Sequence, residues 1–348
     1  MLHSEVDEEN QIKLNFYFMS KLKDNFYFED PGREVLNQIY YYLKKIRLVE
    51  ERIAKEYPKS EIRCPTHLSI GQEGVPAALA TLINKNDYSV STHRGHAHYL
   101  SKGGDLKRMI AELYGKRTGC SGGKGGSMHL IDKEKGFMGT SAIVGNSIPI
   151  GVGLALSIKL QKKDDICCIF VGDGAIEEGV FYESLNFAVL KKLPTLFICE
   201  NNLYSVYSPL RVRQPEGRKI SSIAKAIGAE VVNGDGNNVL ESRKILSKVI
   251  SKIRTGESST WFVEFETYRW REHCGYQFDN DIGYRDEEEF LLWKKRDPIE
   301  IFKRDTFNLV DFKTIDKKIS IEIEEAFEQA KLDPYPSPEE TFKNVYAN

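Results

Sequence analysis

Two short apolar runs near the middle of the chain flank a stretch with helical periodicity. Residues 166–171 and 195–199 are rich in β-branched, aromatic and cysteine side chains, as is typical of buried parallel strands. Between them, apolar residues recur at helical spacing over 180–190, and Pro194 ends that pattern. The pattern predicts a strand, a helix and a second strand that runs parallel to the first.

Polar residues stand where each of these strands is predicted to end. Gly172, Asp173 and Gly174 follow the first strand, and Asn202 follows the second. Because carboxyl ends of parallel strands meet at one edge of a sheet, these side chains should lie together where α/β proteins bind ligands. A carboxylate, an amide oxygen and nearby carbonyls suit magnesium held with diphosphate oxygens. Taken alone, the GDG sequence equally suits a turn whose aspartate caps the helix.

The rest of the chain continues the α/β pattern. Helices are predicted at 33–57, at 240–254 and from about 315 onwards, and a buried strand at 261–265. We therefore predict an α/β fold with a central, mainly parallel sheet flanked by helices. Helical extensions are expected at the N-terminal and C-terminal ends of that domain.

Three segments carry weaker patterns. The segment 67–83 is interpreted as a loop followed by a helix of small residues, and 87–105 as the end of a strand followed by a polar loop. The segment 119–130, GCSGGKGGSMHL, is rich enough in glycine to form a flexible loop that approaches phosphate. Its glycines do not have the spacing of a P-loop, so a Walker A motif is excluded.

Composition sets the broad class of protein. The chain has 348 residues, of which 41% are hydrophobic and 29% charged, with a net charge of −2, which is typical of a globular protein with a large core. We expect one domain over 33–348. An arm over 1–32, in which the sequence NFYF occurs twice, either docks elsewhere or packs on its own domain.

The charge pattern also excludes several partners. No basic stripe stands out, so a nucleic-acid partner is not expected.

No apolar run has the length of a signal peptide or a membrane span, which predicts a cytoplasmic protein without a membrane anchor. The six cysteines form no CxxC pair, and we expect them to be reduced.

Several motifs in a fixed order resemble one known family. They are IGQEG, STHRGHAHYLSKG, GGKGGSMHL, IVGNSIPIGVGLAL, GDGAIEEGVFYESLNFA, LPTLFICENNLYS and ETYRW. From about Arg33 to its end, the chain resembles the alpha subunit of thiamine-diphosphate-dependent 2-oxoacid dehydrogenases, the pyruvate, branched-chain 2-oxoacid and acetoin dehydrogenase group. The resemblance implies the thiamine-diphosphate-binding fold, magnesium as the metal, and oxidative decarboxylation of the EC 1.2.4 type.

The resemblance also assigns roles at the phosphate end of the cofactor. Asp173 and Asn202 would bind magnesium through their side chains, and Tyr204 through its carbonyl. Arg94 would bind the diphosphate, with His93 beside it at a position where relatives have Tyr or His. The cofactor-binding turn is expected to comprise residues 172–175, which are Gly172, Asp173, Gly174 and Ala175.

Further roles concern the reacting end of the cofactor. Backbone groups of Ala142 and Val144 would hold the aminopyrimidine. His67 and His273 align with family histidines that face the substrate, where an imidazole can donate hydrogen bonds and carry protons. For each histidine taken alone, a structural role is the more ordinary interpretation. A zinc site formed by His93, His96 and His98 is a further alternative.

The resemblance implies partners as well. The glutamate that activates the cofactor is expected on a separate beta subunit, in an assembly of two alpha and two beta chains. Glu73, in IGQEG, belongs to an alpha-subunit motif and is not a candidate for that role. The substrate would be a small 2-oxoacid or acetoin, and the acyl unit would pass to the lipoyl group of an acyltransferase.

The segment 269–285 departs from the family pattern. His273 is in register, but Glu272 replaces a small residue, Cys274 replaces a serine, and the loop is longer. A carboxylate beside a substrate-facing histidine would raise the proton affinity of that histidine and repel an anionic substrate, unless Glu272 points to solvent. Two alternatives therefore stand beside oxidative decarboxylation. One is a carboligase that transfers the hydroxyalkyl unit to another carbonyl, and the other is a non-catalytic regulatory or binding subunit.

Overall fold

Six parallel strands form the central sheet, in the order β2-β1-β3-β4-β8-β7. The computed structural model describes residues 31–343, so the predicted arm with its two NFYF sequences lies outside the described residues. The strands are β1 (Tyr88–Ser91), β2 (Phe137–Thr140), β3 (Cys167–Gly172), β4 (Thr195–Asn201), β7 (Glu230–Asp235) and β8 (Thr260–Glu266). The strands predicted from the apolar runs are β3, β4 and β8, and the parallel α/β fold is confirmed.

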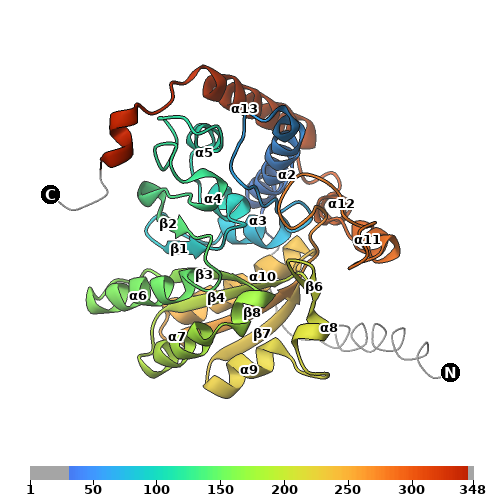
Figure 1. The fold of residues 1–348 in the computed structure, drawn as a ribbon. Helices are drawn as coiled ribbons and strands as arrows, with labels where there is room; N and C mark the ends of the chain where they lie inside the picture. The colour runs from blue at the N-terminus through green and yellow to red at the C-terminus, as the bar shows by residue number, and fades with distance from the viewer. Residues whose placement is uncertain (1–30, 344–348) are drawn as a thin grey trace. The chain divides into compact units, whose positions relative to one another are not determined.

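The alternation of side chains along the strands creates two hydrophobic cores, one on each face of the sheet. In β3, Cys168 and Phe170 pack in one core, whereas Cys167, Ile169 and Val171 pack in the other. Helices α2 (Arg33–Glu56), α3 (Gly74–Ala80), α10 (Val239–Arg254) and α12 (Pro298–Asp305) cover the first core. Helices α6 (Ser147–Leu160), α7 (Gly179–Leu190) and α9 (Ile220–Ile227) cover the second (Figure 1).

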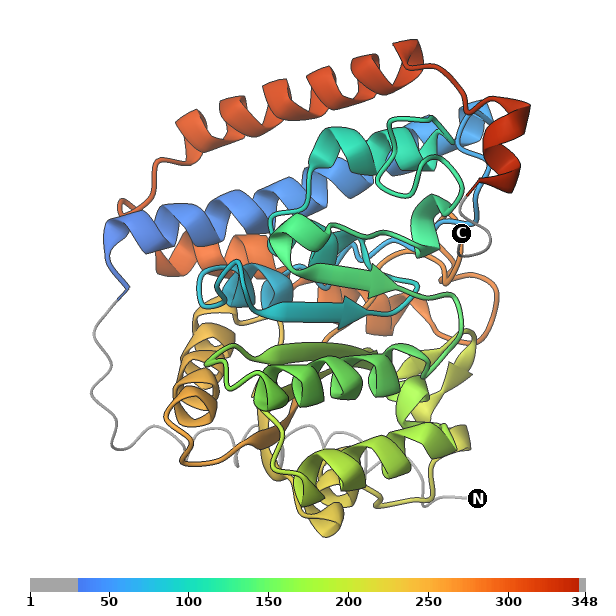
Figure 2. The ribbon, with the colours of Figure 1, turned by 90° about the vertical axis from the view of Figure 1, so that its left-hand side faces the viewer.

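A third hydrophobic core lies away from the sheet, where the two terminal helical segments of the domain meet. The long helix α2 packs there against α13 (Phe312–Leu332), and Figure 2 shows the two helices side by side. Helices α4 (His96–Ser101) and α5 (Leu106–Leu113) complete this core. The helices predicted at 33–57, at 240–254 and from about 315 are thus confirmed as α2, α10 and α13.

Shorter elements complete the described chain. The helices are α8 (Leu210–Arg213) and α11 (Glu287–Lys294), and the hairpin consists of β5 (Tyr204–Ser205) and β6 (Ser208–Pro209). The 3-10 turns are η2 (Tyr57–Lys59), η3 (Gly126–Met128), η4 (Lys133–Lys135), η5 (Asp173–Glu177) and η6 (Pro338–Phe342). Within residues 31–343, none of the helices combines the length and the apolar character that crossing a membrane requires.

The segment after β1 is a helix, so the prediction of a polar loop over 87–105 is wrong in its second half. Helix α4 carries the sequence HAHYLS, and all six of its residues are buried. Its two buried histidines form hydrogen bonds with polar residues that are distant in the sequence. His96 lies 3.2 Å from a Glu50 oxygen, and His98 lies 3.1 Å from a Glu200 oxygen. Polar residues can be buried once hydrogen bonds satisfy them, which local periodicity does not reveal.

Four amides of the glycine-rich segment 119–130 are bonded within the chain, which speaks against the predicted approach of this loop to phosphate. The segment surrounds the carboxylate of Glu112, at the end of α5. The N–H groups of Ser121, Gly123, Gly125 and Gly126 donate to the two Glu112 oxygens at 2.7, 2.9, 2.7 and 3.0 Å. These amides are therefore engaged by an anion of the chain itself.

Candidate active site

A cavity of about 190 Å³ opens at the carboxyl edge of the sheet. It lies beyond the ends of β3 and β4, where ligands bind in open α/β sheets. All twelve residues predicted for the site line it, although they come from loops that are far apart in the sequence. These residues are His67, His93, Arg94, Ala142, Val144, Gly172, Asp173, Gly174, Ala175, Asn202, Tyr204 and His273. Their individual roles stay predictions.

Asp173 and Asn202 form one corner of this cavity. Asp173 begins the turn η5, and α7 has Glu178 as its N-cap, so Asp173 does not cap that helix. Asn202 is held from two sides, because its Oδ1 accepts from the Tyr204 N–H at 3.1 Å and its Nδ2 donates to Gln72 Oε1 at 3.4 Å. These contacts fix the amide with its oxygen towards the backbone of Tyr204.

An arginine already contacts the carboxylate in this corner. Arg213, at the end of α8, pairs with Asp173 and also donates to Glu177 at 2.6 Å. Burial raises the pKa of Asp173, and the Arg213 guanidinium opposes this effect. The free chain therefore neutralises the predicted magnesium ligand with a cation of its own.

Arg94 also lines the cavity, where its guanidinium is fixed by backbone carbonyls. Its guanidinium donates to the carbonyls of Leu68 at 2.6 Å and His273 at 3.0 Å. Burial, followed by the charge of Arg269, lowers the pKa of Arg94 to about 9. Arg94 thus remains a cation at neutral pH, as the predicted contact with diphosphate requires.

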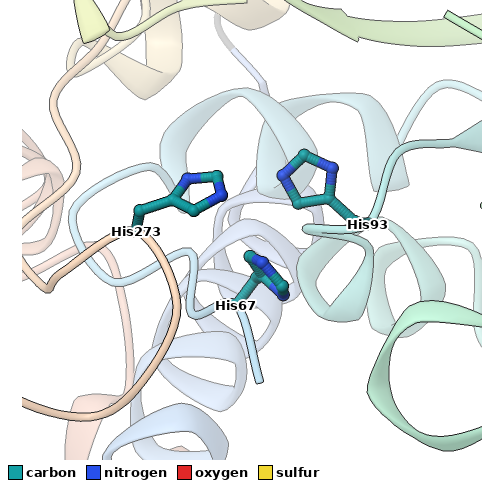
Figure 3. A group of neighbouring side chains, drawn as sticks. All are labelled: His67, His93 and His273. Carbon is teal, nitrogen blue, oxygen red and sulfur yellow. The ribbon is translucent and has the colours of Figure 1, made fainter. Parts of the chain in front are cut away.

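Three histidines that line the cavity face one another (Figure 3). Their ring centroids are 4.6 Å apart for His67 and His93, 4.9 Å for His67 and His273, and 5.4 Å for His93 and His273. Burial lowers the pKa values to about 2 for His67, about 4 for His93 and about 3 for His273, and the Arg94 charge contributes next. All three imidazoles are therefore neutral at pH 7.

The other two histidines of HxxHxH do not join this group. His96 contacts Glu50 and, at 2.8 Å, Ser127, while His98 lies 2.6 Å from Ser91 Oγ and contacts Glu200 through its other ring nitrogen. Both ring nitrogens of each residue are thus in use. Over residues 31–343, the cluster of potential metal ligands includes His93 but neither His96 nor His98, which speaks against the alternative zinc site.

In the segment 269–285, which departs from the family pattern, the carboxylates of Glu272 and Asp279 form contacts within the segment itself. Glu272 Oε1 accepts from the Gln277 N–H at 2.8 Å, which closes a turn within the loop, and Glu272 does not line the cavity. Asp279 forms buried ion pairs with Arg285 and, at 3.5 Å, with Arg269. Cys274 is half-buried and likewise absent from the cavity wall.

Comparison with known proteins identifies the family. The sequence model of the family described as "Dehydrogenase E1 component" matches residues 41–339. The chain belongs to the dehydrogenase E1 component family. It is 36% identical to pyruvate dehydrogenase E1 component subunit alpha-3, chloroplastic, of Arabidopsis thaliana over 313 residues, which is 87% of this chain and 72% of that protein.

The similarity to two further relatives covers most of the length of those proteins. The pyruvate dehydrogenase E1 component subunit alpha of Rickettsia bellii is 35% identical over 321 residues, 91% of this chain and 97% of that protein. The mitochondrial subunit alpha of Sminthopsis macroura is 34% identical over 324 residues, 90% and 86% of the two chains. The resemblance to alpha subunits of thiamine-diphosphate-dependent 2-oxoacid dehydrogenases is thereby confirmed.

The cavity of this E1 chain fits the cofactor that its family implies. Oxygen donors of Asp173, Asn202 and Tyr204 line one corner, and a hard divalent cation prefers such ligands. The turn beside them is tightly packed, because a Cβ on Gly174 would lie 2.4 Å from Ser205 Oγ. Because this turn lines the cavity and has no room for a side chain at Gly174, its backbone suits the approach of a phosphate group.

Sequence reasoning missed several residues of the E1 site. Gln72, which supports Asn202, and Glu200, which pairs with His98, line the cavity but were not predicted to do so. Glu200 offered a signal, because it is a charged residue at the end of an otherwise apolar strand. Arg213 offered none, since a basic residue in an irregular segment is ordinarily solvated.

Proposed function

We propose that this chain is the alpha half of a two-subunit enzyme that decarboxylates a small 2-oxoacid and passes the acyl unit to a lipoyl acceptor. The convergence of all twelve predicted residues on one cavity carries the proposal. Pyruvate is the first substrate to test, because the names of the relatives specify pyruvate dehydrogenase. A cytoplasmic location stays a prediction, since those relatives include chloroplastic and mitochondrial proteins.

The sheet edge would hold the phosphate end of the cofactor. Asp173, Asn202 and the Tyr204 carbonyl would supply magnesium ligands, and Arg94 a fixed guanidinium for the diphosphate. Bound thiamine diphosphate supplies a nucleophilic carbon and an electron sink for decarboxylation. Arg213 pairs with Asp173 Oδ2, so its guanidinium would compete with the metal for that carboxylate oxygen.

The neutral histidines would meet the substrate. His273 Nδ1 lies 3.4 Å from Arg94 Nη2, and a guanidinium only donates hydrogen bonds. Nδ1 is therefore the acceptor, and the ring proton of His273 lies on Nε2, from which it can be donated to a substrate oxygen. His67 lines the same cavity, and its Nδ1 is buried without a hydrogen-bond partner among the described residues.

The surface around α6 and α7 supports the proposal of a beta subunit. Helix α6 is apolar on both sides, although only one side packs on the sheet. Large apolar side chains are exposed on the two helices and the preceding loop. They are Ile143, Val144, Ile150, Leu160, Tyr182, Phe187 and Leu190. An exposed apolar surface that extends to the cavity wall is typical of a subunit interface.

The activating glutamate is proposed to come from that beta subunit, in an assembly of two alpha and two beta chains. Among the described residues, the carboxylates that line the cavity belong to Asp173 and Glu200. Asp173 lies in the magnesium corner, and Glu200 is paired with His98. Glu73 is engaged elsewhere, because it is fully buried against Arg47 at 2.5 Å.

The carboligase alternative loses the observation that favoured it. That alternative depended on Glu272 lying beside the path of the second substrate, and Glu272 is bonded within its own loop. A non-catalytic subunit is likewise not favoured, because the predicted metal, phosphate and substrate residues are all present around one cavity.

The test is an assay of the chain co-expressed with its beta subunit. Carbon dioxide release and lipoyl reduction should be measured with pyruvate, branched-chain 2-oxoacids and acetoin, with the Asp173→Ala variant as a control. We expect both activities with at least one of these substrates and neither in the variant. Carbon dioxide release without reduction of any lipoyl acceptor would contradict the oxidative part of the proposal.

A further inference from the structure

A carboxylate outside the cavity contacts a residue that is expected to bind magnesium. Glu289, in the first turn of α11, accepts a hydrogen bond from the Tyr204 hydroxyl and does not line the cavity. We propose that Glu289 is a positioning residue, which holds Tyr204 so that its carbonyl can bind the metal. The inference rests on the proposed magnesium corner and adds to it a residue that is 85 positions from Tyr204 in the sequence.

Tyr204 is held at its backbone and at the far end of its side chain. Its N–H donates to Asn202 Oδ1 at 3.1 Å, and its hydroxyl donates to Glu289. Its ring packs edge-on against Tyr284 and Tyr268, with centroids 5.3 and 6.3 Å apart. A residue held at both ends has little freedom to rotate. Such fixation from outside the ligand set is what gives a metal ligand its orientation.

The backbone on either side of Tyr204 is strained. Leu203 has a φ of +70° and Val206 a φ of +55°, a region that residues other than glycine, and branched ones above all, rarely adopt. Such strain persists only where surrounding contacts maintain it, and it is concentrated at ligand sites. One contact is the Leu210 N–H, which donates to the Leu203 carbonyl at 2.7 Å. The side-chain contact between the two strained positions is the one from Tyr204 to Glu289.

Glu289 is itself held in place by its helix. Asp286 is the N-cap of α11, and its side chain accepts from the Glu289 N–H at 2.7 Å. The next residue, Phe290, is buried and packs against Trp270 and Phe278, with ring centroids 6.4 and 5.7 Å apart. The carboxylate that receives the Tyr204 hydroxyl therefore belongs to a helical turn anchored at its start and at its buried face.

Calorimetric titration of the assembled subunits with magnesium, in the presence of thiamine diphosphate, tests the inference. Glu289→Ala should weaken magnesium binding about 10- to 100-fold, as is usual when the partner of a metal ligand is removed. Glu289→Gln should lose less, because its amide oxygen can still accept the hydroxyl. Glu288→Ala is the matched control, since Glu288 is exposed in the same turn of α11. Equal affinities of Glu289→Ala and Glu288→Ala would overturn the inference.

A double-mutant cycle separates positioning from a general structural role. Tyr204→Phe removes only the hydroxyl and should weaken magnesium binding by itself, which also covers the case in which Glu289→Ala does not fold. In the Tyr204→Phe background, Glu289→Ala should have little further effect, because the contact is already lost. The same fold-change in both backgrounds, or unchanged affinity in Tyr204→Phe, would contradict the proposed role.

Two further measurements distinguish failure of this inference from failure of the proposed function. Without cofactor, amides at 203–210 should exchange hydrogen faster in Glu289→Ala than in Glu288→Ala, and equal rates would count against the inference. Asp173→Ala tests the magnesium corner itself. If Asp173→Ala loses magnesium binding and Glu289→Ala retains it, the corner stands and Glu289 has no positioning role. If Asp173→Ala binds magnesium as wild type does, the corner is wrong and the inference falls with it.

Discussion

Replacing Glu112 with glutamine tests whether the glycine-rich segment depends on a buried anion. Glu112 is fully buried, and each carboxylate oxygen accepts two N–H groups from the segment. Oε2 accepts from Ser121 and Gly123, and Oε1 from Gly125 and Gly126. The Glu112→Gln side chain has nearly the same shape, but its NH2 group must face one of these two pairs of donors in either orientation.

The expected cost follows from those contacts. A buried donor left without an acceptor costs about 1–3 kcal/mol, so two of them cost roughly 2–6 kcal/mol. Removing the charge recovers part of the desolvation penalty, because no ion pair with Glu112 occurs over residues 31–343. We therefore expect the free energy of unfolding to fall by about 2–4 kcal/mol, close to the upper end for single substitutions.

Denaturant unfolding of wild type and variant would measure this difference, with the slope m checked for constancy. Glu134→Gln is a matched control, because Glu134 is exposed, and it should change stability by no more than about 0.5 kcal/mol. Hydrogen exchange of the amides at 121–126 should be faster in Glu112→Gln. An unchanged unfolding midpoint, or unchanged exchange in this segment, would refute the reasoning.

Four further predictions concern the cavity. Asp173→Ala should abolish magnesium-dependent binding of thiamine diphosphate to the assembled subunits, as calorimetry can show, and unchanged affinity would remove Asp173 from the site. Arg213→Met should lower the stability of the free chain yet strengthen magnesium binding, because a competing cation is lost; weaker magnesium binding would contradict this explanation. His273→Ala should reduce turnover about 10²- to 10⁴-fold with cofactor affinity retained, whereas a merely structural histidine would lower both. Glu272→Gly should leave the ratio of lipoyl reduction to carboligation unchanged, and a shifted ratio would revive the carboligase alternative.

Local sequence patterns are sufficient to predict the central strands. The apolar runs that form β3 and β4 are continuous, and their adjacent parallel register follows from the connecting helix. The sequence alone therefore places Asp173 and Asn202 together, because both directly follow strands. The family motifs then supply His67, Arg94 and His273, which periodicity alone does not connect.

The features that sequence reasoning misses depend on contacts between distant segments. The polar histidines of α4 favour a loop by pattern alone, because their partners Glu50 and Glu200 lie 46 and 102 residues away. The glycine-rich segment suggests a phosphate contact because the position of Glu112 relative to it follows only from the fold. Nothing in the sequence indicates that Arg213 reaches Asp173, 40 residues away.

The exposed apolar residues of α6 and α7 also have a consequence for the cell that makes this chain. An alpha chain synthesised in excess of its partner would display those residues to chaperones and proteases, which recognise hydrophobic surface on incompletely assembled proteins. The steady-state amount of the chain should then follow the supply of beta subunit and not its own rate of synthesis. Gene dosage of the partner would thus set the level of both subunits.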